Sequence, residues 1–187
     1  MWQLCCFVLI YVPLVSGRYH WSICPDVEPL AEVNTTDLEG LWFEIEKFDL
    51  YYERRLARCT ILRLSMDNET RDVHPTLKFK KFGKERNGYH TIQGSLIHMG
   101  QPRGRFLGNL WRSQDIFGRV FDLSLMAFEP NEYMLFYECT SFGFENMWIY
   151  SRNRYLSFET REKLTKMMVD LEVDMRGVII TDQANCP

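Results

Sequence analysis

The sequence has no surplus of positive charge. Its 22 Lys and Arg side chains are outnumbered by 25 Asp and Glu side chains, which gives a formal net charge of -3 at pH 7. A protein whose main partner is nucleic acid normally carries a basic surface, so that function class is excluded. Internal repeats, low-complexity tracts and linkers are also lacking in the sequence. The 187 residues are therefore expected to contain one folded domain.

Histidine is scarce and scattered. The spacing of metal ligands is not found among the four histidines, which are His20, His74, His90 and His98. No Ser-His-Asp arrangement can be argued from the order of the residues. The sequence therefore predicts a protein that is not an enzyme and that carries no metal or other cofactor.

The first residues contain an uncharged apolar run. Residues 1–17 have no charged side chain, and the apolar stretch at residues 4–12 is too short to span a bilayer. Val15-Ser16-Gly17 provides the small residues of a cleavage site. We interpret residues 1–17 as a secretory signal peptide and residues 18–187 as the mature domain. The alternative is a retained membrane anchor.

The cysteines and the asparagine sequons fit secretion. Of the six cysteines, four lie after residue 17, namely Cys24, Cys59, Cys139 and Cys186. An even number of cysteines in a secreted chain indicates two disulfides, for which three pairings exist. Two sequons, at Asn34 and Asn68, predict N-glycosylation, the alternative being unmodified loop asparagines.

Alternation of apolar and polar residues dominates the middle of the chain. It is clearest in residues 40–48, and it recurs at residues 58–67, 76–82, 89–99, 105–112, 119–128, 132–140 and 146–152. Turn signals separate these segments, and Asn87-Gly88 is the strongest of them. About eight strands at short, regular intervals predict an all-β meander that closes into a barrel or forms a sandwich.

The period of the pattern changes towards the C-terminus. Residues spaced i, i+3, i+4 and i+7 form the apolar stripe of one amphipathic helix, consisting of Leu164, Met167, Met168 and Leu171. Ser157 is the expected N-cap, Gly177 lies just past the expected end, and a short strand follows at residues 178–180. We expect the helix to lie outside the barrel, with its stripe on Phe43 and Ile45.

Motifs near both ends of the chain share the order and spacing of one known family. They are Cys24-Pro25, Gly40-Leu41-Trp42 with the following Phe-Glu-Ile-Glu-Lys, Tyr137-Glu138-Cys139, Trp148-Ile149-Tyr150-Ser151-Arg152, and Thr181-Asp182-Gln183 before Cys186-Pro187. Together they resemble the lipocalins, in particular the apolipoprotein D-like branch, over nearly the whole mature chain. The resemblance implies an up-and-down antiparallel barrel of about eight strands with one helix outside.

The resemblance also implies two structural features. In that family an arginine at the end of the last barrel strand stacks on the motif tryptophan and closes the barrel floor, which assigns this role to Arg152 and Trp42. The disulfide pairing that it implies is Cys24–Cys139 and Cys59–Cys186. That pairing leaves no free thiol in the mature chain, which disfavours a reactive cysteine.

The expected ligand pocket is the barrel interior, lined by Trp42, Glu44, Glu46, Leu62, Leu64, Trp148 and Tyr150. The two glutamates share the face of the tryptophan and could meet a polar ligand head. Pairing with an inward Lys or Arg is the favoured alternative, because buried charges are usually paired. Tyr51 and Tyr52 form a ligand lid or simply cover the mouth. A small barrel is either hollow or filled, and the aromatic share of 14% favours a pocket.

Two function classes follow from these observations. The first is a secreted, extracellular carrier of a small hydrophobic ligand such as a fatty acid, sterol, retinoid or bilin-like pigment. The second is an extracellular protein-interaction or defence and signalling factor with a filled barrel. We expect a monomer or weak oligomer. Transient membrane or receptor contact stays open, because the basic run at residues 78–86 is either a membrane contact or the solvated face of a hairpin.

Overall fold

The computed structural model describes residues 24–48, 58–67, 69–70, 72–80, 89–100, 104–112, 119–140 and 143–186. Several expectations fall outside these residues. They are the signal peptide, the connection that contains Tyr51 and Tyr52, the Asn87-Gly88 turn and the sequon at Asn68.

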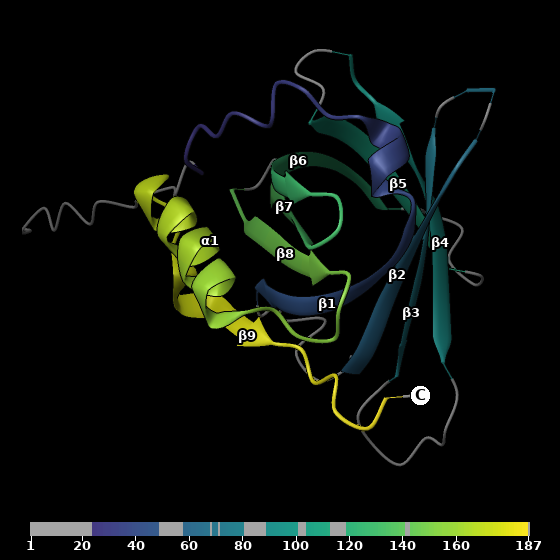
Figure 1. Ribbon diagram of the computed structural model, residues 1–187. Coiled ribbons are helices and arrows are strands. Elements are labelled where there is room, and N and C mark those ends of the chain that lie inside the picture. The colour runs from purple at the N-terminus through teal and green to yellow at the C-terminus, as the bar shows by residue number, and fades with distance from the viewer. Residues whose placement is uncertain are drawn as a thin grey trace, which may run out of the picture.

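Nine strands and three helical segments make up the described part of the chain. In order they are η1 (Thr35–Leu38), β1 (Gly40–Phe48), β2 (Arg58–Met66), β3 (Val73–Lys80), β4 (His90–His98), β5 (Arg105–Arg112), β6 (Arg119–Glu129), β7 (Tyr133–Cys139), β8 (Glu145–Ser151), α1 (Phe158–Asp170), η2 (Met175–Gly177) and β9 (Val178–Ile180). Each strand from β2 to β7 pairs with the next, β1 pairs with both β2 and β8, and β9 pairs with β1. This double pairing closes the sheet into a barrel, with α1 outside it (Figure 1). The predicted all-β, up-and-down barrel with one outer helix is confirmed.

Two boundaries differ from the sequence prediction by three residues or more. Strand β3 begins at Val73, three residues earlier than expected, and includes Pro75, which lies opposite Leu64 of β2. Helix α1 ends at Asp170, well before Gly177. The chain reverses there because Glu172 adopts a positive φ of 64° and Val173 turns back into the core. Gly177 instead ends the short turn η2.

The apolar side chains form two clusters, one on each side of the barrel wall. The inner cluster lies on the inner face of the barrel wall and includes Trp42, Leu62, Leu64, Phe106 and Phe136. The outer cluster lies between the wall and α1. Alternate residues of the same strands supply the two clusters, as the two-residue period of a strand requires.

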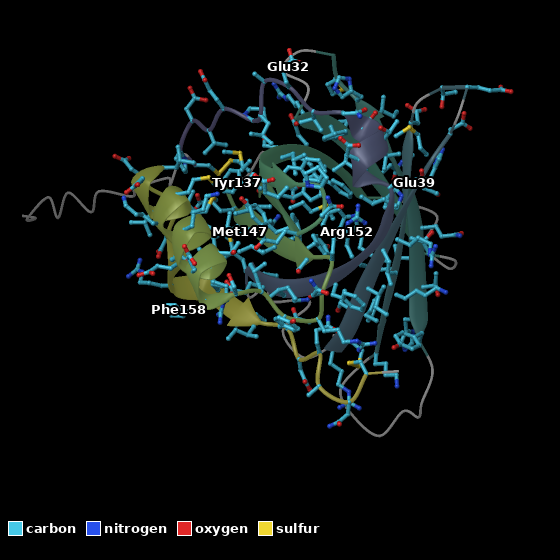
Figure 2. The ribbon with its side chains drawn as sticks, in the orientation of Figure 1. Glu32, Glu39, Tyr137, Met147, Arg152 and Phe158 are labelled. Atoms are coloured by element: carbon cyan, nitrogen blue, oxygen red, sulfur yellow. A yellow bond between two sulfur atoms is a disulfide. The ribbon has the colours of Figure 1, made fainter. Side chains whose placement is uncertain are left out.

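Helix α1 begins as predicted, but it docks at a different place. Ser157 is the N-cap, since its side chain accepts a hydrogen bond of 3.0 Å from the backbone N–H of Thr160. The helix buries Leu164 and Met168 in the outer cluster. Residues of β6, β7 and β8 receive it, including Tyr133, Leu135, Tyr137, Met147 and Ile149, and Figure 2 shows Tyr137 and Met147 beside the helix. The prediction that Phe43 and Ile45 receive the helix was wrong.

A β-bulge in β1 changes which residues of its second half face α1. The register of β1 against β8 shifts between Glu44 and Glu46, so one extra residue stands in β1 at this point. Beyond the bulge the alternation is reversed, and Phe48 joins the outer cluster beneath α1. A single inserted residue therefore exchanges the inward and outward positions of the second half of the strand.

Within the part of the chain that the structure describes, no helix combines the length and apolar character that crossing a membrane requires.

Candidate functional site

One end of the barrel is closed by Trp42 and Arg152. The indole is fully buried, and its Nε1–H donates a hydrogen bond of 2.8 Å to the carbonyl of Leu38 in η1. The guanidinium carbon of Arg152 lies 3.6 Å from the centroid of the indole ring. This is the stack that the resemblance implied, and it combines cation–π attraction with close packing.

Four backbone carbonyls hold the guanidinium of Arg152 in place. Its Nε donates to Pro130 at 2.9 Å, and its terminal nitrogens donate to three carbonyls, those of Asp37 at 3.0 Å, Glu39 at 2.9 Å and Leu41 at 3.2 Å. Burial lowers the pKa of Arg152 below its ordinary value, but an arginine keeps its charge in proteins. One side chain thus ties β8 to η1, to the start of β1 and to the turn before β7.

The glycine of the Gly-x-Trp motif makes room for this arginine. Gly40 has φ +114°, a conformation that residues with side chains rarely adopt. A Cβ atom at this position would lie 2.8 Å from a terminal nitrogen of Arg152. The motif therefore requires glycine both for its backbone conformation and for the approach of the guanidinium.

We expect Trp42→Ala and Arg152→Ala to be coupled by about 1–2 kcal/mol in the free energy of unfolding, because each removes the same stacked contact. A double-mutant cycle measured by urea unfolding checks this. The matched control is Arg154→Ala combined with Trp42→Ala, since the Arg154 guanidinium lies over Phe43 instead, 4.9 Å from its centroid. The control pair should be additive within about 0.5 kcal/mol. Additivity in both cycles would contradict the coupling.

The inner wall beyond this floor can be followed on three neighbouring strands, β7, β8 and β1. From the floor outward, the facing inner residues are Met134, Tyr150 and Glu44, then Phe136, Trp148 and Lys47, then Glu138 and Asn146. On β7 and β8 the wall thus changes from apolar and aromatic to polar with distance from Arg152, while β1 places the charged Glu44 and Lys47 at the first two levels. Leu62 and Leu64 of β2 belong to the same inner cluster.

The two predicted glutamates have different environments. Glu44 faces inward, where its carboxylate lies 3.3 Å from the Lys47 ammonium and accepts a hydrogen bond of 2.7 Å from the Thr181 hydroxyl. This is the pairing that was favoured on the sequence. Glu46 faces outward because of the bulge, and its carboxylate pairs with Arg161 of α1. The prediction that Glu46 lines the interior was wrong.

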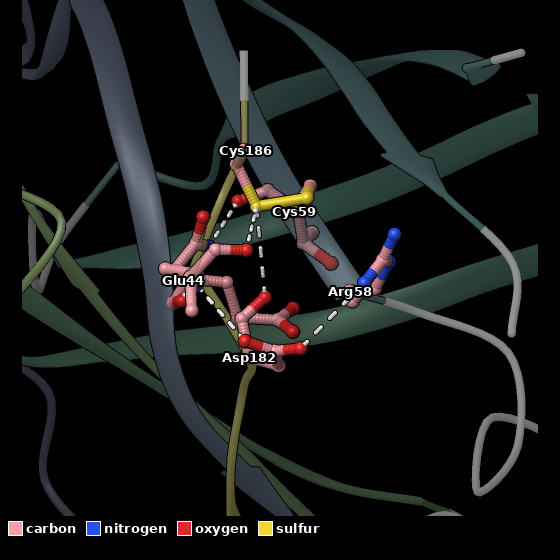
Figure 3. Close-up of a disulfide and its surroundings, with 8 residues drawn as sticks. Glu44, Arg58, Cys59, Asp182 and Cys186 are labelled. Atoms are coloured by element: carbon pink, nitrogen blue, oxygen red, sulfur yellow. Dashed lines mark hydrogen bonds and ion pairs between the residues drawn. A yellow bond between two sulfur atoms is a disulfide. The ribbon is translucent and has the colours of Figure 1, made fainter. Parts of the chain in front are cut away.

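Both disulfides have the pairing that the resemblance implied. Cys24 is bonded to Cys139, and Cys59 is bonded to Cys186. Figure 3 shows the second bond beside Asp182, whose carbonyl accepts a hydrogen bond of 2.8 Å from the Cys59 backbone N–H. The Asp182 carboxylate also lies 4.0 Å from Arg58. The C-terminal tail is therefore fixed against the start of β2.

Sequence reasoning missed Glu138 and Asn146 as inner-wall residues. Both are almost fully buried, at 3% and 1% exposure, and the Asn146 amide donates a hydrogen bond to the Glu138 carboxylate. A signal was available, because Glu138 stands two residues after Phe136 and four after Met134 on the same strand face. A charged residue on an otherwise apolar inner face is unusual and points to a special environment.

A hollow lies outside the barrel. Its volume is about 570 Å³, and it lies between residues 25–31 and the outer faces of β5, β6 and β7, where Arg105 and Asp122 form an ion pair of 2.5 Å. Tyr137 lines it as well, and burial together with a hydrogen bond to Glu145 raises the pKa of this tyrosine. Among the described residues, no group of three His, Cys, Asp or Glu side chains could hold a metal ion.

Comparison with solved structures decides the fold. Insecticyanin from the tobacco hornworm Manduca sexta superposes with a TM-score of 0.70 at 21% identity, over 87% of this chain and 88% of that one. Lobster apocrustacyanin A1 gives a TM-score of 0.65 at 17% identity, over 82% of each chain. This chain has the lipocalin fold.

Comparison of sequences agrees with this lipocalin assignment. Apolipoprotein D from Cavia porcellus is 25% identical over 179 residues, which cover 90% of this chain and 87% of that protein. Apolipoprotein D from Bos taurus is 23% identical, over 96% of this chain and 97% of that protein. No family model matches the chain. The resemblance to apolipoprotein D seen in the motifs thus extends along most of the chain.

Proposed function

We propose that this lipocalin is a secreted carrier that binds a small hydrophobic ligand inside the barrel. The observation that carries the proposal is the inner wall, which is apolar and aromatic next to a floor closed by Trp42 and Arg152. A fatty acid, sterol, retinoid or bilin-like pigment has the size and polarity for such a site.

The chemistry of the wall supports an apolar ligand. Leu62, Leu64, Phe136, Trp148 and Tyr150 all belong to the inner cluster. Transfer of apolar surface from water to such a site contributes about 25 cal/mol per Å². A ligand that loses about 350 Å² of apolar surface gains about 9 kcal/mol by this measure, from which the free-energy cost of association is subtracted.

The covalent structure supports secretion. Two disulfides suit an oxidising compartment, and residues 1–17 have the composition of a signal peptide. Asn34 is exposed at the N-cap of η1, as an asparagine that carries a glycan must be. We propose that residues 18–187 form the mature, extracellular protein, a monomer or weak oligomer.

The test uses the neutral apolar dye N-phenyl-1-naphthylamine. We expect saturable 1:1 binding at micromolar dye, seen as a rise in dye fluorescence and a matching fall in tryptophan emission. Trp148 faces the interior, so Trp148→Phe should reduce the fall in tryptophan emission while dye binding persists. Phe158→Ala is the control on the outer surface and should change neither signal, because Phe158 is exposed.

Absence of saturable dye binding to the folded protein would overturn the carrier proposal. In that event the result would favour a filled barrel and a protein-interaction function. A melting curve recorded on the same samples shows that the protein is folded, so a negative result cannot arise from unfolding.

A further inference from the structure

One side of the barrel wall lacks acidic side chains. Strands β2, β3 and β4 contain no Asp or Glu, although acidic residues outnumber basic ones in the whole chain. Leu62, Leu64 and Val73 belong to the inner cluster, so the alternate residues of β2 and β3 face outward. Figure 1 shows these strands on the opposite side of the barrel from α1. Their outer side is therefore not covered by that helix.

Four cations stand on the outward side of β2 and β3, which we call the basic face; they are Arg58, Arg63, Lys78 and Lys80. Arg63 and Lys78 are exposed, and neither side chain forms an ion pair or hydrogen bond within the described part of the chain. Lys80 lies over the Tyr89 ring, 5.2 Å from its centroid. Lys80 is also the direct partner of Arg58 and stands two residues after Lys78. Such neighbours are about 5–8 Å apart at Cβ, so these cations act together on a charged partner.

The acidic side chains that flank the basic face belong to other segments. Asp182 lies 4.0 Å from Arg58 and offsets part of its charge. Further acidic residues stand just ahead of β1 and around the β2–β3 turn, namely Glu39, Asp67, Glu69 and Asp72. Lys78 is five residues along β3 from Val73 beside that turn, which is about 16 Å. Charges more than about 8 Å apart are largely screened at physiological ionic strength, so the basic face has a positive field of its own.

Uncharged hydrogen-bonding side chains stand beside these cations. Arg63 is the direct partner of Thr76 on β3, and Lys78 is the direct partner of Thr91 on β4. Gln93 of β4 is opposite Thr76, and both Gln93 and Thr91 are exposed. The described residues of β2 and β3 include no exposed large apolar side chain. A surface of cations, hydroxyls and an amide suits a hydrated polyanion, and it lacks the apolar groups that enter a lipid bilayer.

We propose that the basic face binds a sulfated polysaccharide. The sulfate groups of such a chain accept hydrogen bonds from the Arg63 guanidinium and the Lys78 ammonium, and its hydroxyl groups pair with Thr76, Thr91 and Gln93. This inference goes beyond the carrier function, since it concerns the outer surface and not the barrel interior. The choice of a polysaccharide over a lipid surface uses the proposed secretion, because anionic lipids concentrate in the cytoplasmic leaflet.

Heparin, a sulfated polysaccharide, is the probe for the wild-type protein. We expect saturable, micromolar binding to immobilised heparin at about 50 mM NaCl, measured by biolayer interferometry. Binding should be about tenfold weaker at about 300 mM NaCl, because salt screens the attraction.

Two further surfaces separate the other partners that the charge could attract. Hyaluronan carries carboxylates but no sulfate groups, so it has fewer negative charges along its chain and should bind about tenfold more weakly than heparin. Vesicles of phosphatidylcholine in which about one lipid in five is phosphatidylserine should not bind, because the basic face has no apolar side chain to insert.

Two pairs of substitutions assign the binding to the basic face. Arg63→Ser with Lys78→Ser should weaken heparin binding about tenfold, since two of the four cations are lost. Lys166→Ser with Arg176→Ser is the matched control, because it also removes one Lys and one Arg, both exposed, from α1 and η2. The control should change heparin binding by less than about twofold. Melting curves show that both variants are folded, and the wild-type series decides the question if one is not.

The outcomes separate this inference from the carrier proposal. Failure of the wild type to bind heparin at about 50 mM NaCl would overturn the basic face as a binding site. Equal weakening by the two pairs of substitutions would do the same, because binding would then follow overall charge. Binding to the vesicles and not to heparin would overturn the polysaccharide in favour of a lipid surface. Dye binding should be the same in all these proteins, and its absence from all of them would overturn the carrier function alone.

Discussion

Met168→Asp is expected to lower the free energy of unfolding by about 4 kcal/mol, because it removes a buried apolar side chain and places a charge beneath α1. Met168 is 0% exposed and lies in the outer cluster with Leu164, Tyr133 and Ile149. Loss of a buried methionine alone costs about 2–5 kcal/mol. The aspartate adds the cost of removing a charged carboxylate from water at a position that evolved to hold an apolar side chain.

Urea unfolding followed by circular dichroism measures the effect, and the adjacent residue supplies the control. Val169 has 53% exposure on the same helical turn, so Val169→Asp introduces the same charge at almost the same distance from the helix end. We expect it to change the free energy of unfolding by no more than about 0.5 kcal/mol. Equal midpoints for the two variants would show that α1 does not dock through the Met168 face.

Replacing Cys59 and Cys186 together by serine is expected to cost about 5 kcal/mol in the chain-entropy model, because the bond closes a loop of 127 residues. Without the bond the denatured chain gains conformational freedom that the folded state does not share. The urea m-value should rise as well, since the uncrosslinked denatured state exposes more surface.

The hydrogen bonds of the tail give a reason to expect a smaller loss of stability in the double serine variant. Asp182 and Gln183 already bind β1 and β2, through the Cys59 backbone N–H and through the carbonyls of Glu44 and Thr60, each at 2.8 Å. A loss below about 1 kcal/mol in the double serine variant would mean that the denatured chain gains little freedom without the bond. Cys24→Ser with Cys139→Ser is the comparison, as its sequence separation of 115 residues predicts nearly the same entropic cost.

Much of the architecture could be predicted from the sequence because it rests on periods and fixed motifs. The two-residue alternation located the barrel strands, and the stripe of Leu164, Met167, Met168 and Leu171 located the helix. The Gly40-Leu41-Trp42 motif and Arg152 gave the floor through their resemblance to known lipocalins. These signals work because each is enforced by burial on one face or by a conformation that only glycine adopts readily.

The misplacement of Glu46 came from one extra residue in β1, which the two-residue alternation does not predict. Extrapolating the alternation of β1 through Ile45 placed Glu46 inside. The bulge inverts that assignment, and it stands where β1 leaves β2 and meets β9. The polar pair Glu138 and Asn146 was missed for another reason. Its meaning depends on which strands lie side by side, and that requires the register of β7 against β8.

The tail of the chain also bears on the order of folding. Strands β1 and β2 pair only over Gly40–Phe43, and beyond that point Gln183 bridges them by donating to the carbonyls of Glu44 and Thr60. During synthesis, this part of the wall can be completed only after residue 183 has left the ribosome, long after β1. Until then β1 has one edge open for a partner about 140 residues away.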